Sequence, residues 1–326
     1  MFFKTFHPEV FQGHLKKKNY FEGWYFKYVT PSLSHTFAFI PGISLNKHDT
    51  HAFVQVFISD RSKQKETLKT YYFKFDIQQF SFHPKTFKVQ IGDNIFSSES
   101  LYVNISTQEL DMQVHLNHID ITPIKKSWLF PSIMGPFGYL RFMETYHGIV
   151  SMQHDVKGSI LLGKEAISFN AGKGYIEKDW GTSFPSSYTW LQSNHFKNTK
   201  TSFMLSYATI PFLFFKFNGL ISVLMFNGQE YRFATYNLTR VLKISYDDRS
   251  VHLVLKKRQY KLEVTATTTD YTDLASPRHG QMKETIKEGL SGNITLKLYK
   301  KNTLLYEDEG VASGIEIMLK KRNNSK

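Results

Sequence analysis

Residues 241–267 read "VLKISYDDRSVHLVLKKRQYKLEVTAT", and this stretch decides the fold class. Apolar side chains recur at every second position, which is the pattern of a strand that buries one face. A short polar turn at residues 247–249 separates two such segments, and turns of this kind join neighbouring antiparallel strands. The stretch therefore predicts an antiparallel meander.

The same period-2 pattern covers most of the chain, and no segment carries the 3.6-residue apolar stripe of an amphipathic helix. Eight or so strands in each half would suit two closed antiparallel barrels, because closure removes exposed edges and leaves an interior or mouth that can hold a ligand. We therefore expect an all-β protein. The aromatic and β-branched runs that carry this expectation occupy residues 20–29, 35–43, 51–59, 70–77, 110–119, 201–208, 220–236 and 292–309.

The centre of the chain interrupts the pattern. Residues 131–158 contain Pro131, Pro136 and several glycines, which predicts an irregular connector. Residues 175–180 faintly echo residues 20–24, which indicates that each half opens with a similar strand. We therefore predict two domains, an N-terminal barrel with the connector over 1–165 and a C-terminal barrel over 166–326.

The composition narrows the compartment and the partners. The chain has 326 residues, a formal charge of +13 and no cysteine. The lack of cysteine excludes disulfides and thiolate nucleophiles and is typical of a reducing compartment, and the first residues lack the apolar run of a secretory signal, so we expect a cytoplasmic protein. The basic groups at residues 16–18, 256–258 and 320–322 are short. They favour solvated loops, with peripheral contact to an anionic membrane as the alternative, and we expect no nucleic-acid partner.

Residues 208–226, "ATIPFLFFKFNGLISVLMF", approach the length of a membrane-spanning helix. Pro211, Lys216 and the turn signal Asn218-Gly219 interrupt the stretch, so a β-hairpin is the better interpretation. Its tip, "PFLFF", is either packed in the core or exposed, where its aromatic rings could enter a bilayer surface.

The first candidate site residues lie in residues 20–29, "YFEGWYFKYV". In a strand, Glu22 and Trp24 share one face, whereas Tyr25 points to the other. A carboxyl group among aromatic rings has its charged form disfavoured, which raises its pKa and makes Glu22 a candidate proton donor. The alternative is that Glu22 pairs with a lysine at the surface of the sheet.

A second group of candidates lies in residues 174–196, "GYIEKDWGTSFPSSYTWLQSNHF". Alternation places Asp179 on one face of a strand, and Lys178 and Trp180 on the other, unless a bulge intervenes. An acid beside tryptophans is typical either of an exposed turn or of the rim of a pocket.

The strand that follows carries two amides among aromatic side chains. Trp190, Gln192 and Asn194 share one face of this strand. Buried amides must either hydrogen-bond to each other or meet the polar part of a ligand. Both interpretations stay open on the pattern alone.

Glu144 and His147 are three residues apart in the connector, in "FMETYHG". The two side chains could orient a reacting hydroxyl group, or they could form a local hydrogen-bonded pair. The sequence lacks a glycine-rich phosphate loop, a serine nucleophile elbow and a zinc-helix motif, so we expect no metal site and no nucleotide chemistry.

Taken together, these segments resemble the tocopherol cyclase family. The resemblance is carried by "YFEGWYFKYV" (20–29), residues 131–159, "YIEKDWGTSFPSSYTWLQSNHF" (175–196), residues 274–299 and "GVASGIEI" (310–317). A wider resemblance is to carotenoid-hydratase-type proteins, and it implies two lipocalin-like β-barrels packed together. The family resemblance implies an enzyme that cyclises prenylated quinols to chromanols.

Such a reaction needs a proton donor, a stabilised tertiary cation and exclusion of water, and it needs no cofactor. The resemblance implies Asp179 or Glu22 as the acid, with Lys178 beside it. Aromatic faces stabilise a cation, so Trp24, Trp180 and Trp190 would line the prenyl region. Gln192 and Asn194 would hold the quinol head. Tyr25, Glu144 and His147 would also contact the substrate. The alternatives are a lipocalin-like carrier of an isoprenoid and an isoprenoid hydratase.

Overall fold

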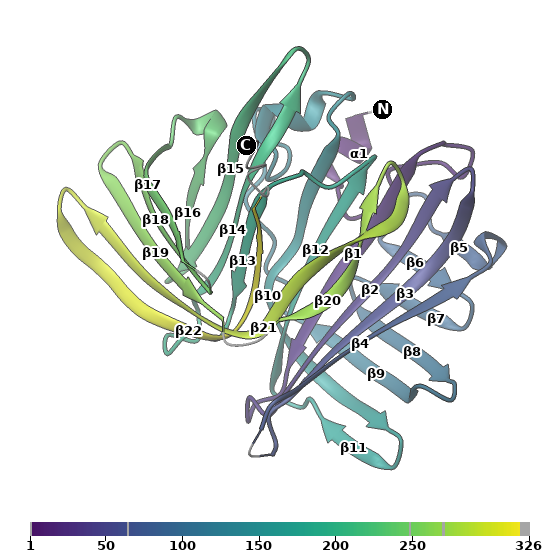
Figure 1. Cartoon of the computed structure of the whole chain (residues 1–326). Helices are drawn as coiled ribbons and strands as arrows, with labels where there is room; N and C mark the ends of the chain where they lie inside the picture. Colours follow the sequence, from purple (N-terminus) through teal and green to yellow (C-terminus); the bar gives the residue numbers. More distant parts are fainter. Residues whose placement is uncertain (1, 64, 248, 269–270, 320–326) are drawn as a thin grey trace, which may run out of the picture. The chain divides into compact units, whose positions relative to one another are not determined.

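The computed structural model describes residues 2–63, 65–247, 249–268 and 271–319 (Figure 1). The chain divides into two compact units. Unit 1 comprises Met1–Ser183 and Ala275–Glu284, and unit 2 comprises Phe184–Leu274 and Thr285–Lys326. This division differs from the predicted boundary after residue 165, because the strand that holds residues 172–181 pairs within unit 1.

Unit 1 contains one large antiparallel sheet, which has 12 strands among the described residues. Its strand order is β4-β3-β2-β1-β12-β10-β9-β8-β7-β6-β5, and β11 pairs with β10. The elements of this unit are α1 (Phe2–Phe6), β1 (Tyr20–Val29), β2 (His35–Asn46), β3 (Asp49–Asp60), β4 (Thr67–Phe75), η1 (Ile77–Gln79), β5 (Phe80–Phe82), β6 (Lys88–Ile91), β7 (Asn94–Ser97), β8 (Ser100–Ser106), β9 (Asp111–Ile119), η2 (Gly135–Tyr139), β10 (Thr145–Leu162), β11 (Glu165–Ser168) and β12 (Gly172–Gly181).

Unit 2 contains a second antiparallel sheet, with 10 strands among the described residues and the order β16-β15-β14-β13-β22-β21-β19-β18-β17. β20 pairs with β21, and the boundary between the units crosses both of these strands. The elements are β13 (Tyr188–Ser193), β14 (Ser202–Phe212), β15 (Phe215–Phe226), β16 (Gln229–Ala234), η3 (Thr235–Asn237), β17 (Arg240–Asp247), β18 (Ser250–Lys257), β19 (Tyr260–Thr267), β20 (Thr272–Arg278), β21 (Gln281–Lys300) and β22 (Thr303–Met318). The all-β, antiparallel prediction is confirmed.

The core of unit 1 lies on one face of its sheet, which we call the inner face. Tyr20, Trp24, Phe26 and Tyr28 of β1 belong to this core, as the alternation of the sequence predicts. Ile176 of β12 joins the same core. The inner face of β1 and β12 is therefore mainly aromatic, and any charged group there is surrounded by rings.

A segment from the second half of the sequence completes unit 1. Gln55 of β3 exchanges two hydrogen bonds with the backbone of Ala275, at 3.1 Å each. Ser44 donates to the carbonyl oxygen of Gly280 at 2.7 Å, and the backbone N–H of Gly280 donates to the carbonyl oxygen of Thr182. These contacts explain why residues 275–284 belong to unit 1.

Three local predictions can now be compared with the structure. The hairpin over residues 208–226 is confirmed: its turn lies between β14 and β15, within the predicted tip, where Leu213 and Phe214 are exposed. The turn signal Asn218-Gly219 lies within β15. The irregular connector ends earlier than predicted, because β10 begins at Thr145. Among the described residues, no helix has both the length and the apolar character needed to cross a bilayer. Asp248 of the predicted turn and residues 320–322 lie outside the described residues.

Candidate functional site

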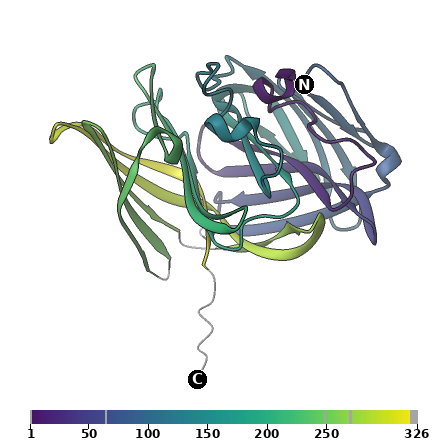
Figure 2. The same cartoon turned by 90° about the horizontal axis from the view of Figure 1, so that it is seen from above.

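A pocket of about 830 Å³ opens in unit 1. Its walls come from α1 and the segment after it, from residues 84–85, and from connector residues 132–141. Tyr20, Tyr146 and Trp180 contribute the part of the wall formed by β1, β10 and β12. Figure 2 shows α1 in purple beside the teal coil of the connector, over the strands of unit 1. The pocket is therefore bounded by the inner face of the sheet and by irregular segments that cover it.

A buried ion pair lies behind this wall. The carboxylate oxygen Oε1 of Glu22 and the ammonium nitrogen Nζ of Lys178 are 2.5 Å apart, and both side chains are fully buried. Glu22 also accepts hydrogen bonds from the backbone N–H groups of Gln12 (2.6 Å) and Gly13 (2.9 Å) and from the hydroxyl of Tyr20 (2.5 Å). Together with the Lys178 ammonium, these donors give the Glu22 carboxyl group four polar partners in the interior. The surroundings of Glu22 thus correct the expectation of a carboxyl group enclosed only by aromatic rings, and the alternative of a lysine partner is realised in the interior.

Lys178 is held by oxygen atoms and flanked by indole rings. Its Nζ donates to the carbonyl oxygen of Pro8 at 2.9 Å and to that of Val10. The same nitrogen lies 4.5 Å from the ring centroid of Trp24 and 5.1 Å from that of Trp180. Burial lowers the pKa of Lys178 to about 8, although the nearby Glu22 carboxylate opposes this shift. Lys178 is therefore a cation in an aromatic cage that releases its proton more readily than an exposed lysine.

Strand register explains why these side chains meet. β1 and β12 pair antiparallel, with Trp24 opposite Lys178 and Glu22 opposite Trp180. Residues that are directly opposite or diagonal on one face lie within reach of long side chains. The four side chains therefore form a block in which each charged group is next to an indole ring. The alternation predicted for Lys178 and Trp180 is confirmed.

Two residues connect the ion pair with the pocket. Tyr20 lines the pocket and donates its hydroxyl to Glu22. Trp180 lines the pocket and contacts the Lys178 ammonium, and its ring stacks on Tyr146 with centroids 5.4 Å apart and planes at 6°. Burial, together with the Glu22 carboxylate, raises the pKa of the Tyr20 hydroxyl well above its usual value. A ligand in the pocket would meet these rings in front of the ion pair.

The opposite face of the same strands carries a second charged group. His147 of β10 hydrogen-bonds through Nδ1 to Asp179 Oδ1 at 2.8 Å, and its Nε2 lies 3.3 Å from Glu177 Oε2, an ion-pair distance. Tyr175 donates its hydroxyl to Glu177 at 2.5 Å. Burial alone would lower the pKa of His147, but the carboxylates of Asp179 and Glu177 outweigh it and raise this pKa to about 10. His147 is therefore an imidazolium clamped between two carboxylates.

The second group is also where a metal ion could bind. His147, Glu177 and Asp179 each offer one donor atom, and these atoms lie within 4.8 Å of one another. Each imidazole nitrogen already faces one carboxylate, so a cation would have to replace the imidazolium proton. The arrangement fits an imidazolium held between two carboxylates, which we call the His147 triad.

The structure divides the predicted site residues of unit 1 into two sets and places Glu144 apart from both. Glu22, Lys178, Trp24 and Trp180 lie together on the inner face, and the first three are fully buried. Asp179 and His147 lie on the opposite face with Tyr25, whose strand partner is Glu177. Glu144 precedes β10, and its carbonyl oxygen accepts the N–H of Thr182 at 2.8 Å. Asp179 is therefore not brought together with Glu22, and the partners of His147 are Asp179 and Glu177 of β12.

The remaining three predicted residues belong to unit 2. Trp190 and Gln192 lie on β13, and Asn194 follows it, and all three are buried. Trp190 lies opposite Glu316 of β22, and Glu316 accepts a hydrogen bond from Tyr188 at 2.7 Å. The amide side chains of Gln192 and Asn194 are therefore in the interior. Their role as a clamp for a head group stays a prediction.

Sequence reasoning missed several contributors to the inner site. Tyr20 precedes Glu22 by two positions, so strand alternation puts it on the face of Glu22, but no motif marks its hydroxyl as a donor to that carboxyl group. Tyr146 has no signal beyond its place in the connector motif. The Pro8 and Val10 carbonyl oxygens are backbone groups from an irregular segment, so no residue pattern announces them.

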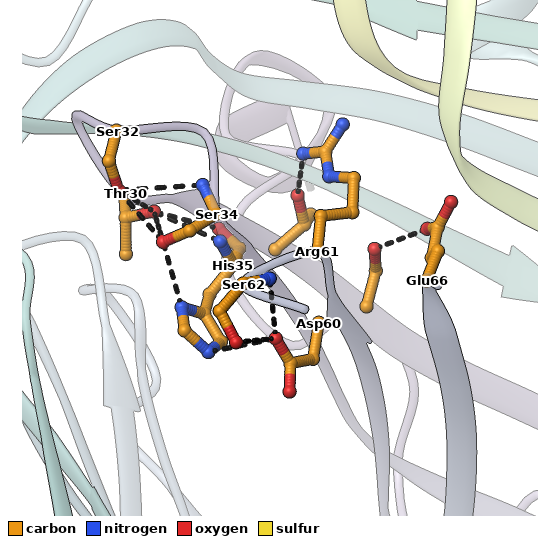
Figure 3. Close-up of polar contacts among 10 residues, drawn as sticks. Thr30, Ser32, Ser34, His35, Asp60, Arg61, Ser62 and Glu66 are labelled. Atoms are coloured by element: carbon orange, nitrogen blue, oxygen red, sulfur yellow. Dashed lines mark hydrogen bonds and ion pairs between the residues drawn. The ribbon is translucent and has the colours of Figure 1, made fainter. Parts of the chain in front are cut away.

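Another polar cluster in unit 1 lies where strands meet the adjoining turns (Figure 3). His35 hydrogen-bonds to Ser34 at 3.0 Å and lies 3.3 Å from Asp60. Asp60 in turn accepts two hydrogen bonds from Ser62. These bonds satisfy the polar groups where β1 joins β2 and where β3 joins β4, so the cluster stabilises turns.

Comparison with known proteins gives a consistent result. The family described as tocopherol cyclase-like matches residues 18–318. A protein provisionally called AttH from Nitrosomonas europaea has 14% sequence identity and a TM-score of 0.55, and the match covers 92% of this chain and 93% of that chain. CghA with Sch210972 has 9% identity and a TM-score of 0.59, with 92% and 88% covered. Kievitone hydratase from Nectria haematococca has 12% identity and a TM-score of 0.51, with 94% and 93% covered. The TM-scores show that these proteins share the fold of this chain, and sequence identities this low show nothing beyond the fold. No curated protein matches the sequence significantly.

Proposed function

Because the chain belongs to the tocopherol cyclase-like family, we propose that it catalyses the acid-promoted addition of oxygen across an isoprenoid double bond. The substrate class is a prenylated quinol, whose phenol oxygen closes a chromanol ring. The observation that carries the proposal is the buried Glu22–Lys178 ion pair between two indole rings, behind the wall of a pocket of about 830 Å³.

In the proposed reaction, the Tyr20 hydroxyl, which lines the pocket, passes a proton to one carbon of the alkene, and a proton from Lys178 replaces it by way of Glu22. The positive charge then moves from the ammonium group to the tertiary carbon of the substrate. The phenol oxygen attacks this carbon, and the phenol proton passes to Glu22 by way of the Tyr20 hydroxyl. Transfer of that proton from Glu22 to Lys178 restores the ion pair. The product is an isomer of the substrate, so the reaction needs no co-substrate and no oxidant or reductant.

Two physical features favour this sequence. The site begins with one positive charge beside Trp180, and this charge passes to the carbocation, so the aromatic face that stabilises the ammonium also stabilises the carbocation. Each indole contributes about 2 kcal/mol in a desolvated setting. The stacked rings of Tyr146 and Trp180 in the pocket wall also limit the access of water to the cation from that side.

A hydratase reaction uses the same first step with water as the oxygen nucleophile, and the kievitone hydratase that shares this fold is named for such chemistry. A carrier would bind the same lipid without changing it. The three possibilities differ in their products: an isomer, a compound heavier by one water, or unchanged ligand.

The test is to incubate the protein with a panel of prenylated quinols and to identify products by mass spectrometry and chromatography. We expect a chromanol from at least one quinol, with Lys178→Met and Glu22→Gln each reducing kcat about 100-fold or more. Asp179→Asn is the matched comparison, because Asp179 is an acid on the opposite face of the same strand. If Asp179→Asn abolishes turnover in a folded protein while Lys178→Met retains it, the acid lies in the His147 triad and this assignment is wrong.

A further inference from the structure

The charged residues that line the pocket all have the same sign. Lys4, Lys17, Lys85 and Arg141 contribute to the lining, and none of the described lining residues is acidic. Lys17, Lys85 and Arg141 are exposed to solvent, so these cations surround the mouth of the pocket. A pocket that bound only a neutral lipid would have no use for this ring of positive charge.

Large apolar side chains are exposed close to the same mouth. Phe3 lines the pocket with 42% of its surface exposed, and Phe142, next to Arg141, is 55% exposed. Trp128 and Leu129 are 76% and 58% exposed. Exposed aromatic and aliphatic groups of this size mark a surface that contacts a partner or a membrane.

The Trp128–Leu129 pair is presented on a fixed turn. Ser127 and Phe130 exchange backbone hydrogen bonds of 3.0 Å, which places the pair at the tip. Tyr139, a pocket-lining residue, donates its hydroxyl to the carbonyl oxygen of Trp128 at 2.5 Å. Lys126 donates to the carbonyl oxygen of Phe6 at 2.7 Å and so attaches the connector to α1. The turn is thus fastened to two segments that form the pocket.

We propose that this surface docks on a bilayer that contains anionic phospholipids, with Trp128 and Leu129 inserted at the headgroup level and the cations of the mouth against the phosphates. Tryptophan is enriched at membrane interfaces because its ring is apolar and its N–H is polar. Each basic residue near an anionic surface strengthens binding, whereas a neutral surface gains nothing from it. The charge of +13 acts in the same direction.

The position of the surface favours a membrane over a protein partner. Exposed cations and exposed apolar side chains surround the mouth of a pocket that is large enough for a lipid. If this surface lay on a bilayer, the pocket would open toward the lipid phase. The proposal goes beyond the reaction proposed above and holds whether or not the bound lipid is converted.

The test is co-sedimentation of the full chain with vesicles of phosphatidylcholine alone and of phosphatidylcholine mixed with phosphatidylserine. Two double variants address the surface, Trp128→Ser/Leu129→Ser and Lys85→Glu/Arg141→Glu. Matched controls lie at the β10–β11 end of unit 1, which Figure 1 shows far from α1. They are Leu161→Ser, at a leucine that is 37% exposed, and Lys157→Glu/Lys164→Glu, which makes the same charge change at exposed positions.

We expect binding to the anionic vesicles that weakens at high salt, and a loss of about tenfold or more in partitioning for each surface variant. The controls should bind like the unaltered protein. The proposal is overturned if the anionic vesicles bind no protein, or if the control variants lose as much as the surface variants. Binding of a soluble anionic amphiphile without any vesicle binding would also overturn it and would assign the cations to a ligand. Failure to detect turnover counts against the proposed reaction alone, because the vesicle measurement does not depend on it.

Discussion

Trp24 lies directly opposite Lys178 in the β1–β12 ladder, and its ring centroid is 4.5 Å from the Lys178 ammonium. The indole also donates its N–H to the carbonyl oxygen of Glu9 at 2.8 Å, so the ring is fixed at both ends. A single side chain thus connects the sheet, the N-terminal segment and the buried cation. This arrangement and the surroundings of His147 and His118 determine how the protein responds to substitution and to pH.

Removing one partner of the ion pair should be more damaging than removing both charges. Lys178→Met leaves the Glu22 carboxylate buried without its cation, and we expect a loss of about 3–5 kcal/mol in the free energy of unfolding. The double variant Glu22→Gln/Lys178→Met should recover a large part of this loss. Urea unfolding followed by tryptophan fluorescence measures both. Equal losses in the single and double variants would show that the pair is not coupled.

The rate of the proposed reaction should fall in alkaline solution. The proton on Lys178 is present below its folded-state pKa of about 8 and is lost above it. We therefore expect kcat/KM to decrease about tenfold for each pH unit above about 8, because the source of the proton is progressively deprotonated. A pH profile on a confirmed substrate checks this. A rate that stays constant between pH 7 and pH 10 would exclude Lys178 as the source of the proton.

The contribution of the His147 triad to the free energy of unfolding should be larger below neutral pH than above it. The folded-state pKa of about 10 exceeds the unfolded value of about 6.5, so its contribution is complete below about pH 6.5 and is lost as the pH rises toward 10. We expect His147→Gln to cost a few kcal/mol at pH 6 and much less at pH 10. Deprotonation of Lys178 changes the stability in the opposite direction, because its folded-state pKa of about 8 lies below its pKa in the unfolded chain. Both proteins share this contribution, so the difference in unfolding free energy between His147→Gln and the parent isolates the triad. A difference that does not change with pH contradicts the imidazolium assignment.

Another histidine should make the protein sensitive to acid. His118 lies 2.7 Å from the Tyr28 hydroxyl, and burial lowers its pKa to about 4. Since this value is below the unfolded one, the stability is complete above about pH 6.5 and falls as the pH drops toward 4. We expect about 2–3 kcal/mol to be lost over this range, and His118→Gln to lose less. Thermal unfolding at pH 7 and pH 5 checks the difference, and equal shifts in both proteins would be inconsistent with it.

Alternation along single strands carried most of what could be predicted from the sequence. It placed Glu22 with Trp24, and Lys178 with Trp180, because side-chain direction in a strand follows from position alone. Pairing between strands is a different problem. Residues 20–24 and 175–180 resemble each other, and we interpreted them as the openings of two domains, whereas they are neighbours in one sheet.

That missed pairing explains the errors in the site. Once β1 and β12 are adjacent, Lys178 must face Glu22, and Asp179 must point to the opposite face toward His147. The N-terminal carbonyl oxygens that hold Lys178 could not be predicted, since every residue has a carbonyl group and only the path of the chain decides which ones converge.

The contribution of residues 275–284 to unit 1 has a consequence for how the protein is made. Ser44 and Gln55 hydrogen-bond to the backbone of Gly280 and Ala275, which lie more than two hundred positions further along the chain. During synthesis, the N-terminal unit leaves the ribosome long before these residues exist, although domains otherwise tend to fold as they emerge. A nascent chain that has reached Ser183 therefore carries a sheet with unfilled hydrogen-bonding positions. Until Glu284 has been added, the N-terminal sheet lacks these backbone partners and is accessible to chaperones and proteases.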